Sequence, residues 1–400
     1  MDPMVIVGAG ECGTRAAFAL RENGWPGGIV LIGEESGLPY ERPPLSKPGG
    51  AGVVRRDICD AAALVAHGIE FRAATRVESL DRTQRTLQLR GGESLCYGRL
   101  LLATGARPRA LDCPGGETAL PFRTHDDARA LFGQIRTEAR AILVGAGLIG
   151  MELAATLRQA GMAVTVVEAG ERALGRGIPA AVAQRLQACH EARGVQFRFG
   201  AGIERLEAGA VRLTDGTRLP ADVVLAAIGV LPDTRLAQQA GLAIDNGIVV
   251  DGRLCSSDPH IHAAGDCARF PCRRTGETLR LESWQNARDQ GEHAARAMLG
   301  SADAFDAIPW FWSDQYQLGL QLAGWPSAQR PLLERQVDAG TTLWFQLDED
   351  GHLLSACGLG PGNGVARDIK LARLLLERAQ PLSAAALQDP AIPLKSLLRG

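Results

Sequence analysis

Two stretches of the 400-residue chain decide its fold: MVIVGAGECGTRAAFALRENGWPGGIVLIGEE at residues 4–35 and RAILVGAGLIGMELAATLRQAGMAVTVVEAGE at residues 140–171. Each begins with a short apolar run, continues with GxGxxG and an amphipathic stretch, and ends with a second apolar run and an acidic residue. Short apolar runs that alternate with a helical pattern are typical of parallel βαβ units. The chain therefore contains the same unit twice, which predicts two dinucleotide-binding domains.

The three glycines of each motif have different steric roles. The first permits a tight turn, the second lets the backbone approach a pyrophosphate, and the third lets the helix pack closely on the strand. In chain order they are Gly8, Gly10 and Gly13 in the first unit and Gly145, Gly147 and Gly150 in the second. The helix N-terminus then offers N–H groups and a partial positive charge to a diphosphate.

An acidic residue follows the second strand pattern of each unit. Glu34 and Glu168 are placed there to accept hydrogen bonds from the hydroxyl groups of a ribose. The alternative for either glutamate, taken alone, is an ordinary solvated carboxylate at a strand end.

Further apolar runs that end in glycine, LLATGARPR and VLAAIGVLPDT, divide the chain into domains. They indicate a first dinucleotide-binding domain made of residues 1–110 and 230–306, with the second inserted at residues 111–229. The remaining residues, 307–400, show two strand patterns around a DEDG turn and a helix with one apolar face, which predicts an α+β domain. The expected fold class is α/β: two Rossmann-like dinucleotide-binding domains, the second interrupting the first, plus a C-terminal α+β domain.

Composition excludes several classes of function. A formal net charge of -2 gives no bulk attraction to nucleic acid or to an anionic membrane surface. No apolar run reaches the roughly 18 residues that a membrane-spanning helix needs, and no basic segment precedes the first strand pattern. We therefore expect a cytoplasmic protein with neither a nucleic-acid nor a membrane partner.

The nine cysteines are odd in number and scattered, and no two form a CxxC pair. This distribution favours reduced thiols over a disulfide framework or a zinc ribbon. The set nearest to a metal site has a spacing that fits no common zinc-ligand pattern, so no metal is expected. Its members are Cys255, His260, His262, Cys267 and Cys272.

Further motifs reveal a family resemblance that covers the whole chain. They are ERPPLSK (41–47), ATG (103–105), FRTHDDA (122–128), AAGDCA (263–268), LESWQNA (281–287) and PWFWSDQ (309–315). The chain resembles the FAD-dependent pyridine-nucleotide oxidoreductases of the glutathione-reductase fold. More narrowly, it resembles the NADH-dependent ferredoxin reductases that serve bacterial Rieske-type aromatic-ring dioxygenases and some cytochrome P450 systems. ATG and the GD of AAGDCA occur broadly, whereas ERPPLSK together with PWFWSDQ is much narrower.

The resemblance assigns the first βαβ unit to FAD and the second to NAD. By the family pattern, the FAD-binding residues are Gly8, Gly10, Gly13, Glu34, Arg42, Lys47, Thr104, Gly105, Arg123, Asp266 and Trp284. The corresponding NAD-binding residues are Gly145, Gly147, Ile149, Gly150, Glu168, Arg176, Gly229 and Glu282. Asp266 would meet the ribityl chain or the phosphates, and its alternative is a turn residue or a helix cap. Arg176 would lie along the adenosine, and its alternative is a surface arginine without a role.

Glu168 also bears on the choice between the two nicotinamide cofactors. A carboxylate at this position accepts both ribose hydroxyls and repels a 2′-phosphate, which favours NADH. Arg172 and Arg176 follow closely, and an arginine near this position is usual in NADPH sites. NADH is the expected cofactor, with strict exclusion of NADPH left open.

Lys47 is the first of only three lysines in the chain. The family pattern sets it at the N5 and O4 edge of the flavin, paired with Glu152. There the compact ammonium would stabilise negative charge that arrives with a hydride, which a bulkier, planar guanidinium would do poorly. The alternative for Lys47 is a solvated lysine in a turn. The alternative for Glu152 is a surface glutamate that compensates the helix dipole. The prolines that would stiffen this segment are Pro39, Pro43, Pro44 and Pro48.

The same segment supplies no cysteine between Gly13 and Asp57. Relatives that reduce disulfides carry a cysteine pair there, so this chain is expected to pass electrons to the metal centre of a partner. By the family pattern Trp312, with Trp310 nearby, would shield the flavin edge and line the electron path. For alternating aromatic residues in a strand the alternative is core packing. A basic docking face would attract an acidic ferredoxin. The candidate residues for this face are Arg55, Arg56, Arg273 and Arg274. The alternative for each of them is a solvated surface arginine without a role in docking.

The predicted function is that of an NADH-dependent ferredoxin reductase. A hydride would pass from NADH to FAD, and single electrons would pass on to a [2Fe-2S] ferredoxin, Rieske-type or plant/adrenodoxin-like, that feeds a terminal oxygenase. One alternative is a reductase for rubredoxin or another one-electron acceptor. Another is a flavoprotein whose NADH-induced conformational change is its output, and a third is a peroxidase-like role for Cys12.

Overall fold

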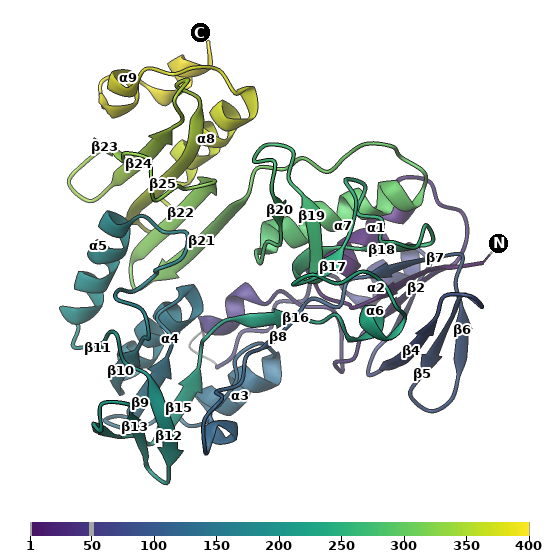
Figure 1. The fold of residues 1–400 in the computed structure, drawn as a ribbon, viewed down its shortest axis with the longest axis horizontal. Helices are drawn as coiled ribbons and strands as arrows, with labels where there is room; N and C mark the ends of the chain where they lie inside the picture. Colours follow the sequence, from purple (N-terminus) through teal and green to yellow (C-terminus); the bar gives the residue numbers. More distant parts are fainter. Residues whose placement is uncertain (1, 48–51, 400) are drawn as a thin grey trace. The chain divides into compact units, whose positions relative to one another are not determined.

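The computed structural model describes residues 2–47 and 52–399, so Pro48 of the proline-rich segment lies outside the described residues. The chain forms two compact units, each assembled from three separate segments (Figure 1). Unit 1 consists of Met1–Pro44, Arg55–Arg107 and Val230–Ala307. Unit 2 consists of Leu45–Val54, Pro108–Gly229 and Ile308–Gly400.

Unit 1 contains a five-stranded parallel sheet in the order β18-β7-β1-β2-β3. Its central strands β1 (Met4–Val7) and β2 (Ile29–Ile32) are buried along their whole length, as expected for apolar runs in a parallel sheet. Burying each such side chain contributes about 1.5–3 kcal/mol. Helix α1 (Glu11–Glu22) connects the two strands and completes the first predicted βαβ unit.

Helix α7 (Trp284–Met298) packs against α1 (Figure 1). The close approach requires Gly291, because a Cβ atom there would lie 2.4 Å from the carbonyl oxygen of Cys12. The other elements of this part of the chain are η1 (Pro43–Ser46), α2 (Ala61–Ala66), β3 (Ile69–Arg72), β4 (Val77–Asp81), β5 (Thr86–Leu89), β6 (Ser94–Cys96), β7 (Arg99–Leu102), β8 (Ala106–Pro108), β16 (Val230–Pro232), α6 (Arg235–Gln239), β17 (Ile248–Val249), β18 (Ile261–Ala263), η3 (Gly265–Cys267), β19 (Ala268–Pro271) and β20 (Thr278–Leu279).

Unit 2 contains a second parallel sheet, four-stranded, in the order β11-β10-β9-β15. Strands β9 (Arg140–Val144) and β10 (Ala163–Val167) are connected by helix α4 (Leu148–Gln159), which completes the second predicted βαβ unit. The other elements of this segment are η2 (Gly116–Thr118), α3 (His125–Phe132), α5 (Ala180–Glu191), β11 (Gln196–Arg198), β12 (Ile203–Glu207), β13 (Ala210–Leu213), β14 (Arg218–Pro220) and β15 (Val223–Ala226). Two parallel sheets of this kind confirm the predicted α/β class.

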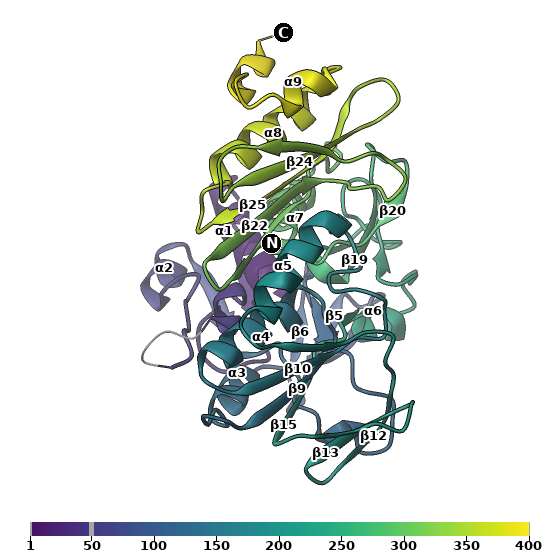
Figure 2. The same ribbon diagram turned by 90° about the vertical axis from the view of Figure 1, so that its left-hand side faces the viewer.

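The C-terminal part of unit 2 is an antiparallel five-stranded sheet in the order β21-β22-β25-β24-β23. Helix α8 (Ala366–Arg378) packs on it through the predicted apolar face, which includes Ile369 and Ala372 (Figure 2). The antiparallel sheet together with its helices confirms the predicted α+β character of this segment. Its other elements are β21 (Trp310–Gln315), β22 (Leu318–Gly324), β23 (Leu333–Gln336), β24 (Thr342–Leu347), β25 (Leu353–Pro361), α9 (Ala384–Gln388) and η4 (Leu394–Leu398).

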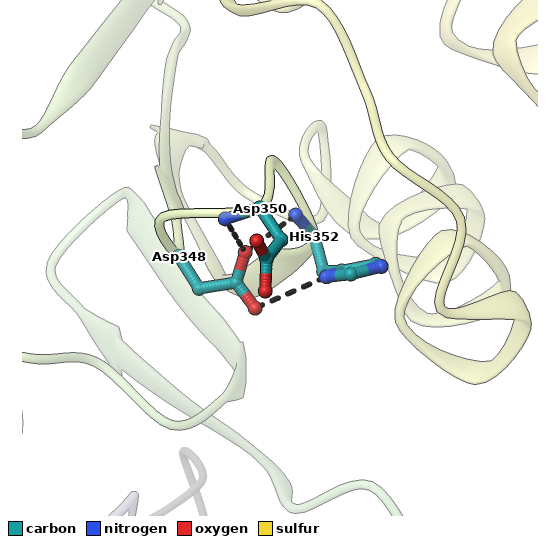
Figure 3. A group of neighbouring side chains, drawn as sticks. All are labelled: Asp348, Asp350 and His352. Carbon is teal, nitrogen blue, oxygen red and sulfur yellow. Dashed lines mark hydrogen bonds and ion pairs between the residues drawn. The ribbon is translucent and has the colours of Figure 1, made fainter.

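The predicted DEDG turn connects β24 to β25 and gathers Asp348, Asp350 and His352 (Figure 3). Their ligand atoms lie within 4.8 Å of one another, and within the described part of the chain this is the one group of three such residues. The carboxylate of Asp348 accepts hydrogen bonds from the backbone N–H groups of Asp350 and His352, and it contacts the His352 ring at 3.2 Å. These contacts are those of a side chain that closes its own turn.

None of the helices in residues 2–47 and 52–399 has the length and apolar character needed to cross a lipid bilayer.

Candidate functional site

The first glycine motif of unit 1 forms a tight turn with open space at its second glycine. Gly8 has φ +112°, and a Cβ atom there would lie 2.1 Å from the carbonyl oxygen of Ala103, so no other residue fits. A Cβ atom on Gly10 would meet nothing within 4 Å. Gly10 is also the N-cap of α1 and provides no side-chain cap for the first turn. The turn therefore fits a diphosphate at the helix N-terminus.

The second glycine motif repeats this geometry in unit 2. Gly145 has φ +105°, and a Cβ atom there would lie 2.4 Å from the carbonyl oxygen of Ala227. Gly147 is the uncapped N-cap of α4, and a Cβ atom on it would again meet nothing within 4 Å. Both turns thus keep free the space that a dinucleotide needs, and the residues present fit FAD at one and NAD at the other.

Glu168 follows β10 directly and faces the second glycine turn. Its two carboxylate oxygens accept hydrogen bonds from the N–H groups of Ala146, at 2.7 Å, and Gly170, at 2.8 Å. These bonds fix the carboxylate beside the turn. In the first unit, Glu34 is more exposed and forms an ion pair with Arg76 at 3.2 Å.

The two arginines that follow Glu168 differ in their surroundings. The guanidinium of Arg172 donates to backbone carbonyls of its own loop, those of Ala173, Leu174, Gly175 and Ile178. It holds that loop and is not offered to a 2′-phosphate. Arg176 is exposed and lies at Gly229, where a Cβ atom would be 3.3 Å from its Nη2 atom.

Three of the residues expected to bind FAD lie in short turns of unit 1. Thr104 donates a hydrogen bond at 2.5 Å to the carbonyl of Asp233, directly before Gly105. Asp266 lies in η3, a turn held by Gln290, whose side-chain oxygen accepts from the N–H of Gly265 at 2.8 Å. Asp266 is therefore a turn residue, as the alternative interpretation has it. Its contact with FAD stays a prediction.

Arg42 and Glu11 are two further ionisable residues of unit 1. Arg42 donates to the carboxylate of Glu35 at 2.8 Å and to the hydroxyl of Tyr40 at 3.1 Å. Burial, together with the charge of Glu41, raises the pKa of Glu11 to about 7. Glu11 is the first residue of α1, and in the protonated form it adds no negative charge beside a diphosphate. Glu11 is not among the residues predicted from the sequence.

Lys47 lies between two carboxylates of unit 2. Its Nζ atom is 3.7 Å from Glu152 Oε1 and 2.9 Å from Asp314 Oδ2. Glu152 is only 6% exposed, on the buried side of α4, so the reading of this residue as a surface glutamate is wrong. Lys47 is not a freely solvated turn lysine either. The pairing of Lys47 with Glu152 is as expected, and Asp314 is an addition to it.

Two serine hydroxyls complete the surroundings of Glu152. Ser46 donates to one carboxylate oxygen at 2.5 Å and Ser313 donates to the other at 2.7 Å. Burial raises the pKa of Glu152 above its usual range, and the charge of Lys47 and the two hydroxyl groups offset only part of this increase. A buried carboxylate is tolerated when a cation and hydrogen bonds compensate it, as they do here. Both serines were missed, although Ser313 and Asp314 lie in the quoted PWFWSDQ motif.

Strand β21 carries aromatic residues on one face and buried polar residues on the other. Trp310, Trp312 and the exposed Asp314 alternate with the buried Ser313 and Gln315. The rings of Trp310 and Trp312 stack with their centroids 5.1 Å apart. Trp312 is half-buried, so it packs against Trp310 and remains partly exposed.

The remaining predicted residues are distributed over both units. Arg123 lies in unit 2 before a capping box at α3, and Trp284 opens α7 in unit 1. Ile149 is 46% exposed at the start of α4. Glu282 lies in unit 1, where it pairs with Arg280 at 2.5 Å.

The four arginines proposed for docking are not equivalent. Arg55 pairs with Asp57 at 3.0 Å, and Arg274 pairs with Asp306 at 2.8 Å. Arg56 pairs with Glu41 at 3.5 Å but keeps 70% of its side chain exposed, and Arg273 is also exposed. The last two are the ones that offer charge to solvent.

Comparison with known proteins gives matches along nearly the whole chain. The family described as pyridine nucleotide-disulphide oxidoreductase matches residues 2–291, and the family described as reductase C-terminal matches residues 310–398. The chain is 39% identical over 407 aligned residues, 99% of each chain, to the anthranilate 1,2-dioxygenase system ferredoxin–NAD(+) reductase component of Burkholderia cepacia.

Solved structures agree with these matches. The ferredoxin reductase for the CYP199A2 system from Rhodopseudomonas palustris superimposes with a TM-score of 0.94 at 35% identity and covers 100% of both chains. The covalent putidaredoxin reductase–putidaredoxin complex gives a TM-score of 0.92 at 34% identity, covering 100% of this chain and 98% of the other.

Proposed function

The chain belongs to the pyridine nucleotide-disulphide oxidoreductase family, and we propose that within it the protein is an NADH-dependent ferredoxin reductase. The resemblance inferred from the sequence motifs is thereby confirmed. The observation that carries the proposal is the pair of glycine turns, each of which leaves space at Gly10 or Gly147 beside an uncapped helix N-terminus. A chain with two such turns is built to bind two dinucleotides.

We assign the first turn to FAD and the second to NADH. FAD, when bound, supplies a ring that accepts two electrons as a hydride and releases them one at a time. The N–H groups at the start of α1 and α4 hold the two diphosphates. Glu34 and Glu168 orient the riboses, and Lys47 holds a positive charge, compensated by Glu152, for the negative charge that a hydride brings.

The acceptor is a one-electron carrier, for which we propose a [2Fe-2S] ferredoxin that feeds a terminal oxygenase. The relatives support this choice, since two of them are a ferredoxin reductase component of a dioxygenase system and a reductase in complex with putidaredoxin. Arg56 and Arg273 offer exposed positive charge for an acidic partner, and Trp312 is a partly exposed aromatic residue. The nine free thiols and the use of NADH suit a cytoplasmic location.

A peroxidase-like role for Cys12 is disfavoured. The thiol is buried, and burial raises its pKa well above the usual range. A thiol that stays protonated is a poor nucleophile toward peroxide. Rubredoxin and other one-electron acceptors remain as alternatives to ferredoxin, and a conformational output remains as an alternative to turnover.

The domain division follows from this assignment. We propose that residues 1–110 and 230–306 bind FAD, that residues 111–229 bind NAD, and that residues 307–400 form the C-terminal domain. The match of the reductase C-terminal family to residues 310–398 supports the last boundary.

The purified protein is expected to be yellow and to oxidise NADH when a ferredoxin or another one-electron acceptor is present. Absorbance near the flavin bands and the rate of NADH consumption test this directly. A correctly folded but colourless protein that takes up no FAD would contradict the proposal. A long-lived complex of NADH with the flavin, without turnover in air, would favour the conformational alternative.

Replacing Glu168 by glutamine is expected to lower the preference for NADH over NADPH about tenfold, equivalent to about 1.4 kcal/mol. The amide keeps an acceptor for the N–H of Ala146 but no longer repels a 2′-phosphate. The ratio of kcat/KM for the two cofactors measures the effect. Glu171→Gln, an exposed neighbour in the same loop, is the matched control. An unchanged ratio in Glu168→Gln would remove the role of this carboxylate in discrimination.

A further inference from the structure

A line of buried polar side chains runs from α5 to Glu152 inside unit 2. His190 Nε2 lies 2.9 Å from Gln315 Oε1, and Gln315 Nε2 lies 3.1 Å from Ser313 Oγ. Ser313 Oγ in turn lies 2.7 Å from Glu152 Oε1. The first three residues are 0% or 1% exposed, and Glu152 is 6% exposed. The line is therefore buried along its length and ends on the partner of Lys47.

The chemistry of the groups fixes the direction of every hydrogen bond. The carboxylate of Glu152 only accepts, so Ser313 donates to it, and the oxygen of Ser313 accepts from the amide nitrogen of Gln315. The amide oxygen of Gln315 then faces His190 and requires a proton on Nε2. His190 Nδ1 is left as an acceptor, and the hydroxyl of Tyr316 lies 3.4 Å from it.

All the dipoles of this line consequently point their positive ends toward Glu152. Hydrogen bonds aligned in this way polarise one another in a low-dielectric interior, so the effect exceeds that of the last bond alone. Burying these polar groups costs folding free energy unless each one finds a hydrogen-bond partner. Apolar side chains at the same positions would pack without that requirement.

The charged groups around the line are few. Near His190 the charged group is Arg193, which follows the end of α5 and lies with its guanidinium carbon 4.5 Å from the centroid of the Tyr316 ring. Phe197 from β11 contacts the imidazole edge-on. Near Glu152 the charged groups are Lys47 and Asp314. Burial, with a smaller contribution from Arg193, lowers the pKa of His190 to about 4. The imidazole is therefore neutral at physiological pH.

We propose that His190 and Gln315 are positioning residues that act through Ser313 to keep the Glu152 carboxylate charged and directed toward Lys47. The inference rests on the proposed role of the Lys47–Glu152 pair in flavin reduction. It extends that role from two residues at the site to a second layer on α5 and β21. None of these outer residues was predicted from the sequence.

The proposal makes a specific claim on the pH dependence of the holoprotein. Gln315→Leu and His190→Phe remove donors from the line, so protonation of Glu152 becomes easier. The acid limb of the rate of flavin reduction by NADH is expected to move to higher pH by about one unit. His190→Gln keeps an N–H donor at this position and should restore most of the wild-type profile. Gln187→Leu, which faces Glu191 on the exposed side of α5, is the matched control.

The tautomer of His190 gives a second readout that needs no turnover. Nitrogen-15 NMR of the holoprotein at pH 7, with His190→Phe to assign the signal, should show a neutral ring protonated on Nε2. A neutral ring protonated on Nδ1 alone would overturn the proposal, because Nε2 would then have no proton to donate to Gln315 and the line could not point toward Glu152.

The two hypotheses fail in different ways. If Lys47→Met slows flavin reduction while Gln315→Leu and His190→Phe keep the wild-type pH profile, the inference is wrong and the pair retains its role. If Lys47→Met has no effect, the role of the pair is wrong, and the nitrogen-15 spectrum still decides the direction of the line. A shifted profile that His190→Gln restores, together with the Nε2 tautomer, supports the inference.

Discussion

Lys47→Met is expected to slow the reduction of bound flavin by NADH about 100-fold, the usual loss when one preorganised electrostatic group is removed. Methionine keeps the length and apolar stem of lysine but provides no charge where hydride transfer builds negative charge. It also leaves Glu152 buried without its cation, and a carboxyl in that state takes up a proton instead. Binding of FAD should change far less, since its diphosphate is held at the start of α1.

Anaerobic stopped-flow mixing of the holoprotein with NADH measures this rate, and equilibrium dialysis of the apoprotein measures FAD binding. The chain offers a matched control in Lys370→Met, an exposed lysine on α8 that should behave as wild type. Lys47→Arg keeps the charge in a bulkier planar group, and its rate of flavin reduction should fall between those of Lys47→Met and the wild type. Equal rates of hydride transfer in Lys47→Met and the wild type would remove the role given to this ammonium.

The second large effect is expected from alanine at the middle glycine of each motif. Gly10→Ala should weaken FAD binding about 100-fold, or by about 3 kcal/mol, because its methyl group occupies the space reserved for a diphosphate. Gly147→Ala should raise the KM for NADH by a similar factor and leave FAD bound. Neither variant should destabilise the apoprotein, since both residues have negative φ and a Cβ atom would meet no other atom within 4 Å.

The two variants serve as controls for each other. Thermal unfolding of both apoproteins, the Kd for FAD and the KM for NADH make a complete comparison. Gly8→Ala provides the contrast, because its Cβ atom would lie 2.1 Å from a backbone oxygen and should lower stability itself. If Gly10→Ala bound FAD normally, or if both variants affected the same cofactor, the assignment of the two turns would be contradicted.

The sequence predicted best those features that local sterics dictate. A turn with positive φ whose backbone lies against the end of the neighbouring parallel strand admits only glycine, so the motifs at Gly8 and Gly145 could be predicted from the sequence. The buried parallel strands could also be predicted from the sequence, because an apolar run such as MVIV has no polar face to expose to solvent.

The surroundings of Lys47 were only partly predictable. The resemblance suggested Glu152, but Ser46, Ser313 and Asp314 come together through folding of segments separated by more than 100 residues, as the Ser46 and Glu152 contact shows. A signal was present in β21, where a period of two puts Ser313 and Gln315 on the buried face of an aromatic strand. Polar residues at two successive buried positions indicate a hydrogen-bond network, although the partner on α5 cannot be read from the strand itself.

The central claim is that a hydride from NADH leaves this protein as single electrons. The direct test is anaerobic double mixing: NADH is added in amounts equal to the bound flavin, and an oxidised [2Fe-2S] ferredoxin follows. We predict that the flavin bands bleach first and then recover while the ferredoxin is reduced in one-electron steps, both electrons of each hydride being accounted for. Flavin that is never bleached by NADH, or that bleaches and then leaves the ferredoxin oxidised, would contradict the account.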